Sequence, residues 1–354
     1  MKAPTGKSSV GIKKLAESIG ISIGTVSRAL NNRQGVNART RERVLEEARR
    51  IGYVPNSAAR QLKDSPSLVL GLFFAPFVGP GHTINPAALS FVEMLTRQAE
   101  AESISLRTLF FASEEELKTQ AEANHLDVAI FYGQFPPQAF DIIHRIGIPA
   151  IILHSRSPHP DQISLCIDMR HAAATAVEYL AALGHEKIGI VTGPHIGLHA
   201  ANYHQGFLEA LEEFALPYCK EWDFELTAEK ANKAGACEAL TPLMRKKDRP
   251  SAFLFTSDWM ALGGRQAAAE AGLSVPREVS IIGFENMPTS AEIDPPLTTF
   301  DIHFPKAAEL VIELAEKLGE GRRAGLPVPT REILISAELI KRKSCFLMRG
   351  ARQQ

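Results

Sequence analysis

The sequence has little cysteine and no long apolar run. Its 354 residues contain four cysteines (Cys166, Cys219, Cys237 and Cys345) and no CxxC pair, so neither a disulfide framework nor a zinc ribbon is indicated. No stretch reaches the roughly 18 apolar residues of a membrane-spanning helix, and the start, MKAPTGKSSVGIKK, lacks the apolar segment of a secretory signal. We therefore expect a cytoplasmic protein with reduced thiols.

Net charge is also nearly absent, but the charges are unevenly distributed. The whole chain carries a net charge of -1, whereas the residues up to Lys63 include thirteen basic and four acidic side chains, a net charge of +9. A small basic module therefore precedes a large acidic one, and DNA would attract the first and repel the second. Charge alone leaves a solvated helical surface as an equal alternative. The length suggests two or three domains with a substantial core.

Three short helices are expected in the basic module. The first has apolar residues at helical spacing, Ile12, Leu15, Ala16 and Ile19, and Gly20 can end it in the left-handed conformation. Ser22 can cap a second helix, in which Val26, Ala29 and Leu30 share a face. Asn37 can cap a third, whose core residues are Val44, Leu45, Ala48 and Ile51. Two helices joined by a glycine-containing turn predict a helix-turn-helix.

The second helix is expected to enter the major groove of DNA. Most side chains of this helix that lie outside the core are short. The predicted DNA contacts are Ile23, Gly24, Thr25, Ser27, Arg28 and Asn31. Arg28 can bond a guanine through two hydrogen bonds, while the helix start lies where base contacts concentrate. A three-helix bundle that binds no DNA is the alternative, and the charge of the module weighs against it. The segment after Asn56, SAARQLK, is too short to be a stable helix alone and should fold only against DNA or a second copy.

Beyond Pro66 the pattern is that of an α/β protein with parallel sheets. Apolar runs alternate with amphipathic helices, and the runs begin at Leu68, Val128, Ala150, Lys187, Ser251 and Val279. Ligands of such sheets bind at the carboxyl ends of strands, which are the turns at Phe77, Ser155, residues 193–203, Asp258 and Glu285. Asp258 opens a helical segment and is equally well explained as its N-cap.

No catalytic, metal or cofactor site is indicated. The run GISIG resembles the nucleophile elbow of hydrolases, but a helix rather than a strand precedes it, so Ser22 is better explained as a cap. His195 and His199 are four residues apart, yet they begin in a loop after Gly193 and have no accompanying carboxylate pattern. We expect neither an enzyme nor a metalloprotein.

The chain resembles the lactose-repressor (LacI) family of bacterial regulators over nearly its whole length. The segments that carry the resemblance include IKKLAESIGISIGTVSRALN, VNARTRERVLEEARRIGYVPNSAARQLK, AVEYLAALGHEKIGIVTGP and FTSDWMALGGRQAAAEAGLSVPREVSIIGFEN. The resemblance implies a DNA-binding headpiece (9–55), a hinge helix and linker (56–66), a two-lobed domain of periplasmic-binding-protein type (67–343) and a tail (344–354). The N-lobe would comprise about 67–166 and 297–326, and the C-lobe about 167–296 and 327–343.

The resemblance also implies how DNA is bound. Two hinge helices would pair in the minor groove of a near-palindromic operator bound by a homodimer, with Leu62 inserted at a base step. The implied hinge contacts are Asn56, Ala59, Leu62 and Lys63. The implied effector contacts in the cleft are Phe77, Asn85, Ser155, Tyr203, Ser257, Asp258, Trp259, Glu285 and Phe304.

Several cleft positions depart from the sugar-binding members of the family. Tyr203 stands where those members usually carry arginine, and Ser155, Ser257 and Glu285 also replace common polar residues. A site loses much affinity for a hydroxyl when its partners change, so an ordinary hexose is not expected. A carbohydrate derivative, another small molecule, and no effector at all stay open. The sequence predicts an allosteric transcriptional regulator, with a solute-binding protein of the same two-lobed fold as the alternative.

Overall fold

The computed structural model describes residues 12–30, 36–51, 68–74, 85–111, 113–133, 135–159, 161–195, 197–326 and 331–348. The chain divides into two compact units, Met1–Ser67 and Leu68–Gln354. No helix within the described ranges is long and apolar enough to cross a membrane.

The first unit contains three helices, α1 (Ile12–Ile19), α2 (Ile23–Leu30) and α3 (Ala38–Arg50). The predicted boundaries are confirmed: Gly20 has φ 71°, and the side chains of Ser22 and Asn37 accept hydrogen bonds from backbone amides of α2 and α3. The helices enclose a small core made of Leu15, Ala16, Val26, Ala29, Val44 and Ala48. The prediction for Leu45 was wrong, because its side chain is 37% exposed on the outer side of α3.

The second unit begins with a six-stranded parallel sheet, the N-lobe, in the order β11-β5-β4-β3-β1-β2. Its strands are β1 (Val69–Phe74), β2 (Ser105–Leu109), β3 (Val128–Tyr132), β4 (Ala150–Leu153), β5 (Gln162–Ile167) and β11 (Arg331–Ile335). Its helices are α5 (Pro86–Ala101), α6 (Glu114–Ala123), α7 (Pro137–Arg145) and α13 (Phe304–Ala324).

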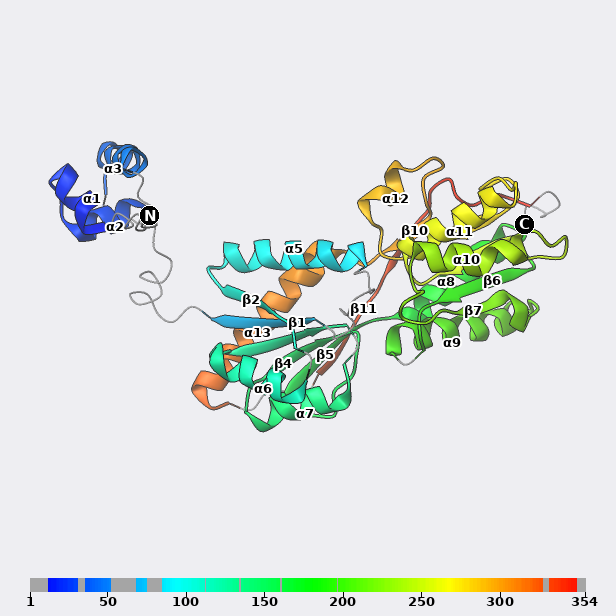
Figure 1. Ribbon diagram of the computed structural model, residues 1–354, viewed down its shortest axis with the longest axis horizontal. Coiled ribbons are helices and arrows are strands. Elements are labelled where there is room, and N and C mark those ends of the chain that lie inside the picture. Colours follow the sequence, from blue (N-terminus) through cyan, green and yellow to red (C-terminus); the bar gives the residue numbers. More distant parts are fainter. Residues whose placement is uncertain are drawn as a thin grey trace, which may run out of the picture. The chain divides into compact units, whose positions relative to one another are not determined.

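Alternate side chains of the strands pack against helices on the two faces of this sheet (Figure 1). Leu70 and Leu72 of β1 belong to the core formed with α5 and α13, whereas Phe73 belongs to the core formed with α6 and α7. Because both faces are covered, the central strands β1, β3 and β4 are apolar along almost their whole length rather than alternating. This explains why the sequence showed uninterrupted apolar runs.

The C-lobe is a second parallel sheet in the order β7-β6-β8-β9, again covered on both faces. Its strands are β6 (Ile188–Thr192), β7 (Asp223–Glu225), β8 (Ala252–Phe255) and β9 (Ser280–Ile282). Its helices are α8 (Met169–Ala182), α9 (Leu198–Glu213), α10 (Lys233–Met244), α11 (Asp258–Glu270), the short α12 (Pro288–Glu292) and the 3-10 turn η1 (Lys220–Trp222).

Two strands, β10 (Thr299–Asp301) and β12 (Glu338–Ile340), pair antiparallel beside the lobes. Two predicted lobe boundaries need correction. Strand β11 was expected in the C-lobe, but it pairs along its length with β5 and so completes the N-lobe sheet (Figure 1). The predicted tail begins inside the C-lobe, because Ser344 is fully buried and its hydroxyl donates to the carbonyl of Ile281.

Candidate functional site

The start of α2 presents an open surface in the first unit. Ile23, the first residue of the helix, is 39% exposed, so its side chain is available for contact. A Cβ atom at Gly24 would meet only Ser22 Oγ, at 3.8 Å. The hydroxyl of Thr25 lies 2.9 Å from Ser22 Oγ and is thus part of the helix cap. An exposed helix start with little side-chain bulk can approach a base pair closely.

The other predicted DNA contacts are only partly within the described structure. Ser27 and Arg28 lie on α2. The remaining ones lie outside the described residues: Asn31, Asn56, Ala59, Leu62 and Lys63. Their contacts with DNA stay predictions.

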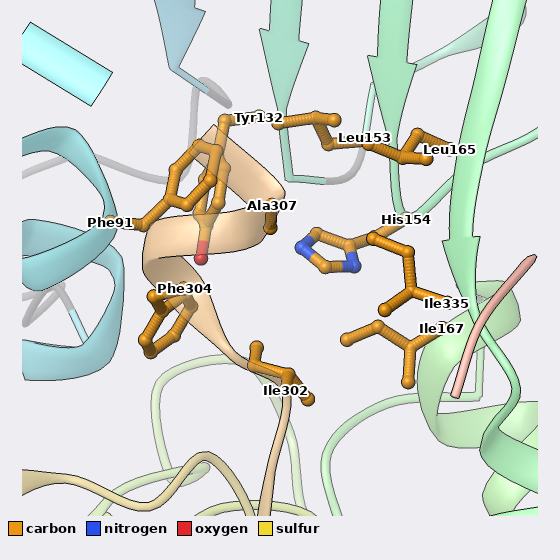
Figure 2. Close-up of a pocket in the computed structure, with 10 residues that line it drawn as sticks. All are labelled: Phe91, Tyr132, Leu153, His154, Leu165, Ile167, Ile302, Phe304, Ala307 and Ile335. Carbon is orange, nitrogen blue, oxygen red and sulfur yellow. The ribbon is translucent and has the colours of Figure 1, made fainter. Parts of the chain in front are cut away.

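Two adjoining cavities lie where strand ends of the N-lobe meet the C-lobe. The first, which we call the apolar cavity, has a volume of only about 20 Å³ and is lined by Phe91, Tyr132, Leu153, His154, Leu165, Ile167, Ile302, Phe304, Ala307 and Ile335 (Figure 2). The second, which we call the polar cavity, has a volume of about 170 Å³ and is lined by Tyr132, Gly133, His154, Ile167, His199, Glu285 and Ile302. Four lining residues are common to both, so the cavities form one cleft with an apolar and a polar part.

Glu285 is the acidic residue that lines the polar cavity. Its backbone φ is 98°, a conformation that a residue with a side chain rarely adopts. Its Oε1 accepts a 2.6 Å hydrogen bond from Asn85 Nδ2, whereas its Oε2 is buried without a hydrogen-bond partner. Burial, followed by the nearby carboxylate of Asp258, raises the pKa of Glu285 well above its usual range. A strained residue with an unpartnered carboxyl oxygen is typical of a ligand contact.

Two histidines complete the polar part of the cleft. The His154 ring points into the cavity (Figure 2), and its Nδ1 has no hydrogen-bond partner. Its ring lies edge-on to those of Tyr132, at 5.3 Å, and His199, at 5.5 Å. Burial lowers the pKa of His154 to about 4 and that of His199 to about 3. Both imidazoles are therefore neutral near pH 7, and each can donate one hydrogen bond and accept another.

Three of the predicted effector contacts lie at this cleft. Glu285 lines the polar cavity, Phe304 lines the apolar cavity, and Asn85 bonds to Glu285. Asn85 also caps α5, because its Oδ1 accepts from the backbone amide of Ala87. Phe77 lies outside the described residues.

Five other predicted contacts line neither cavity: Ser155, Tyr203, Ser257, Asp258 and Trp259. Tyr203 is fully buried beside the ring of Phe284, and Trp259 packs against the same core. Ser257, not Asp258, caps α11, since its hydroxyl accepts from the amide of Met260. Contact of these residues with an effector stays a prediction.

The carboxylate of Asp258 holds the segment that carries Glu285. It accepts hydrogen bonds from the hydroxyls of Thr299, at 2.5 Å, and Ser290, at 2.6 Å, and from the amide of Met287, at 2.8 Å. The alternatives weighed from the sequence, a helix cap and a ligand contact, both missed this role. A carboxylate with three donors fixes a loop more firmly than a cap would.

Sequence reasoning missed Tyr132, His154 and Ile302 as lining residues. The rule that ligands bind at the carboxyl ends of parallel strands does apply to them, because Tyr132 ends β3 and His154 directly follows β4. His199 lies within residues 193–203, a turn that the same rule led us to expect at the cleft, with a contact to ligand or solvent favoured over a metal. Among the described residues, no group of three or more histidines, cysteines and acidic residues has an arrangement suited to a metal ion.

Two family models match this chain, one within each of its two compact units. Residues 11–56 match the family model "Bacterial regulatory proteins, lacI family", and residues 177–345 match the model "Periplasmic binding protein-like domain".

Three relatives of similar length are described as transcriptional regulators or repressors. The chain is 28% identical to the HTH-type transcriptional regulator MalR of Streptomyces coelicolor, with 96% of this chain and 97% of the relative covered. It is 28% identical to the HTH-type transcriptional repressor PurR of Mannheimia succiniciproducens, with 94% and 98% covered, and 29% identical to the repressor CytR of Escherichia coli, with 84% and 86% covered.

Solved structures show the same fold. The lac repressor dimer bound to operator and the anti-inducer ONPF matches with a TM-score of 0.72 and 24% identity, covering 96% of this chain and all of that one. The complex of the transcriptional regulator CelR with cellobiose matches with a TM-score of 0.68 and 20% identity, covering 95% and 99%. On the evidence of headpiece, body and relatives together, this chain belongs to the LacI family of bacterial regulatory proteins.

Proposed function

We propose that the chain is a cytoplasmic transcriptional repressor that binds a near-palindromic operator as a homodimer and is controlled by a small molecule in the cleft. The observation that carries the proposal is the capped helix-turn-helix, whose second helix begins with exposed Ile23 and Gly24 in a module of net charge +9. A solute-binding protein of the same two-lobed fold needs no such module.

The cleft supports the second half of the proposal. It contains buried polar atoms without partners, on His154 and Glu285, which a ligand could satisfy. The relatives' names describe regulators and repressors, and the CelR structure contains cellobiose. A ligand can shift DNA affinity only by its difference in affinity between two lobe arrangements, and a coupling of about 1–3 kcal/mol is typical.

Electrophoretic mobility shifts with the upstream intergenic DNA of the gene test the first half. The wild-type chain should give a specific shift, and Arg28→Ala and Leu62→Ala should each weaken it by about tenfold or more, because each removes a base contact or a wedge. Arg245→Ala, which removes an exposed positive charge from the body, is the matched control and should leave the shift unchanged. Absence of any specific shift would overturn the proposal.

A further inference from the structure

The cleft combines an apolar compartment with a small polar one. Aromatic and aliphatic side chains such as Phe91, Phe304, Leu165 and Ile335 surround the apolar cavity, and Figure 2 shows them on opposite sides of the His154 ring. The polar cavity adjoins it through shared residues. A ligand that contacts both parts must have an apolar body and a short polar head.

Among the described residues, the polar cavity is lined by one acidic side chain and by no lysine or arginine. Glu285 is its carboxyl group, and neither lysine nor arginine is among the described residues that line the two cavities. The histidines are uncharged near pH 7 because burial lowers the pKa of both. A ligand carboxylate or phosphate would therefore meet no lysine or arginine among these side chains to offset the loss of its hydration.

We propose that the effector is an amphipathic cation, with a protonated amine that pairs with Glu285 and an aromatic or aliphatic body that extends from the polar cavity toward the apolar side chains beside it. The inference rests on the proposed function and names the chemical class of its effector. It differs from the sugar-binding pattern, in which several hydroxyls each need a polar partner.

The free polar atoms match the donors of an ammonium group. Asn85 already occupies Oε1 of Glu285, so Oε2 is available as an acceptor. His154 Nδ1 also lacks a partner and can accept a hydrogen bond from the same group. An ammonium head has three donors and a positive charge, so it satisfies both of these acceptors.

A neutral hexose fits less well. Each hydroxyl that lies against the apolar side chains would lose its water without gaining a partner, at a cost comparable to a lost hydrogen bond. The apolar body of an arylalkylamine has no such penalty. The requirement for one head and one apolar body therefore favours the amine over the sugar.

Pairing with an amine should release a proton. Burial and the carboxylate of Asp258 raise the pKa of Glu285 in the free protein, so its carboxyl keeps its proton to a higher pH than an ordinary glutamate does. The groups that face it from neighbouring elements are Asn85 of α5, Tyr132 of β3, His154 after β4, His199 of α9 and Asp258 of α11. None of these is a cation near pH 7. The carboxyl must therefore lose its proton to solvent when the ammonium binds, and affinity should rise with pH.

Isothermal titration calorimetry of the full chain without DNA tests the inference with three probes of one shape. These are 2-phenylethylamine, which is cationic, 2-phenylethanol, which is neutral, and phenylacetate, which is anionic. We expect the amine to bind at least about tenfold more tightly than either other probe, as is typical of a charge-assisted hydrogen bond in a buried site. Its affinity should rise with pH, with proton release that varies with the ionisation enthalpy of the buffer.

The variant Glu285→Gln keeps the size of the side chain and removes its charge. It should weaken binding of 2-phenylethylamine by about tenfold or more and abolish the pH dependence, while 2-phenylethanol changes by less than about twofold. Glu292→Gln, at an exposed position of α12, is the matched control and should bind the amine like the wild type. The pH and buffer measurements on the wild type do not depend on any variant.

The inference is overturned if 2-phenylethanol or phenylacetate binds as tightly as the amine, if Glu285→Gln leaves amine affinity unchanged, or if no probe binds. Operator binding by the same preparation separates this failure from failure of the proposed function. A chain that shifts operator DNA but binds no amine keeps the function and loses the effector class.

Discussion

The amide of Asn85 donates a 2.6 Å hydrogen bond to Oε1 of Glu285, joining residues 200 positions apart. Asn85 caps α5 in the N-lobe, and Glu285 follows the β9 strand of the C-lobe. The bond therefore links the two lobes at the cleft itself. Any ligand that pairs with Glu285 changes the charge of a group on which this link depends, which couples the ligand to the arrangement of the lobes.

Replacement of Asn85 by aspartate should weaken the link. Asn85→Asp keeps a helix-capping acceptor but puts a second carboxyl beside Glu285 in place of the donor. We expect the free energy of unfolding to fall by about 1–3 kcal/mol in urea titrations, with a larger loss at pH 8 than at pH 5 because two carboxylates repel only when both are ionised. Asn232→Asp is a matched control, since Asn232 also caps a helix but its amide donates to the carbonyl of Glu229. An equal loss in both variants would contradict the prediction.

Removal of the Thr299 hydroxyl should lower the free energy of unfolding more than removal of an exposed threonine hydroxyl does. It donates a 2.5 Å hydrogen bond to the fully buried Asp258. Thr299→Val keeps the shape and removes the donor, so one lone pair of a buried carboxylate loses its partner, at a cost of about 1–3 kcal/mol of stability. Thr289→Val, at an exposed position of α12, should change stability by less than about 0.5 kcal/mol. Chemical denaturation of the two variants checks the difference.

Stability should depend on pH through Asp258. Burial raises its pKa to about 6, despite the hydrogen bonds from Ser290 and Thr299 that lower it. The folded protein thus holds a proton that the unfolded chain releases at lower pH, so the contribution of Asp258 to stability is fully present below about pH 4 and is lost as pH rises through about 6. The shift corresponds to about 3 kcal/mol.

The comparison with Asp258→Asn isolates this contribution. Asparagine does not titrate, so the variant should lose less stability than the wild type between about pH 4 and 6, and Glu285, whose pKa is also raised, accounts for the dependence that stays. Parallel pH profiles of the two proteins in guanidinium titrations would show that another group causes the dependence.

Most of the fold was predictable from the sequence because its signals are local. The left-handed Gly20, the caps Ser22 and Asn37 and the apolar strand runs all depend on neighbouring residues. Strand β11 was misplaced because its partner β5 lies more than 160 positions earlier, and no local pattern specifies that pairing. Leu45 was misassigned because periodicity alone does not show where the apolar side of a three-helix core ends.

The position of the cleft was predictable from the sequence, but only some of its lining residues were. The strand-end rule and the resemblance led to Glu285 and Phe304, which do line it. His154 was overlooked in favour of its neighbour Ser155, because the φ of 65° that turns the chain at His154 leaves no trace in the sequence. Tyr203 was assigned to the cleft by alignment, yet the apolar core takes up its ring.

Two helical glycines should respond in opposite directions to alanine. A Cβ at Gly206 in α9 would lie 2.5 Å from the backbone oxygen of Arg170, so the close contact of α8 and α9 requires glycine there. A Cβ at Gly321 in α13 would meet nothing within 4 Å. Gly206→Ala should therefore cost about 1–3 kcal/mol through overpacking against backbone that cannot move aside. Gly321→Ala should add about 0.5–1 kcal/mol, because alanine favours the helix and restricts the unfolded chain.

Each glycine variant is the control for the other, since both make the same chemical change within a helix. Thermal unfolding followed by circular dichroism should place the melting temperature of Gly206→Ala below that of the wild type and that of Gly321→Ala above it. If both variants are stabilised, helix propensity outweighs the packing of α8 on α9, and the close approach at Arg170 does not constrain the C-lobe. Because the glycine contact lies between two helices of one lobe, Gly206→Ala should also leave operator binding intact at temperatures where the variant is folded.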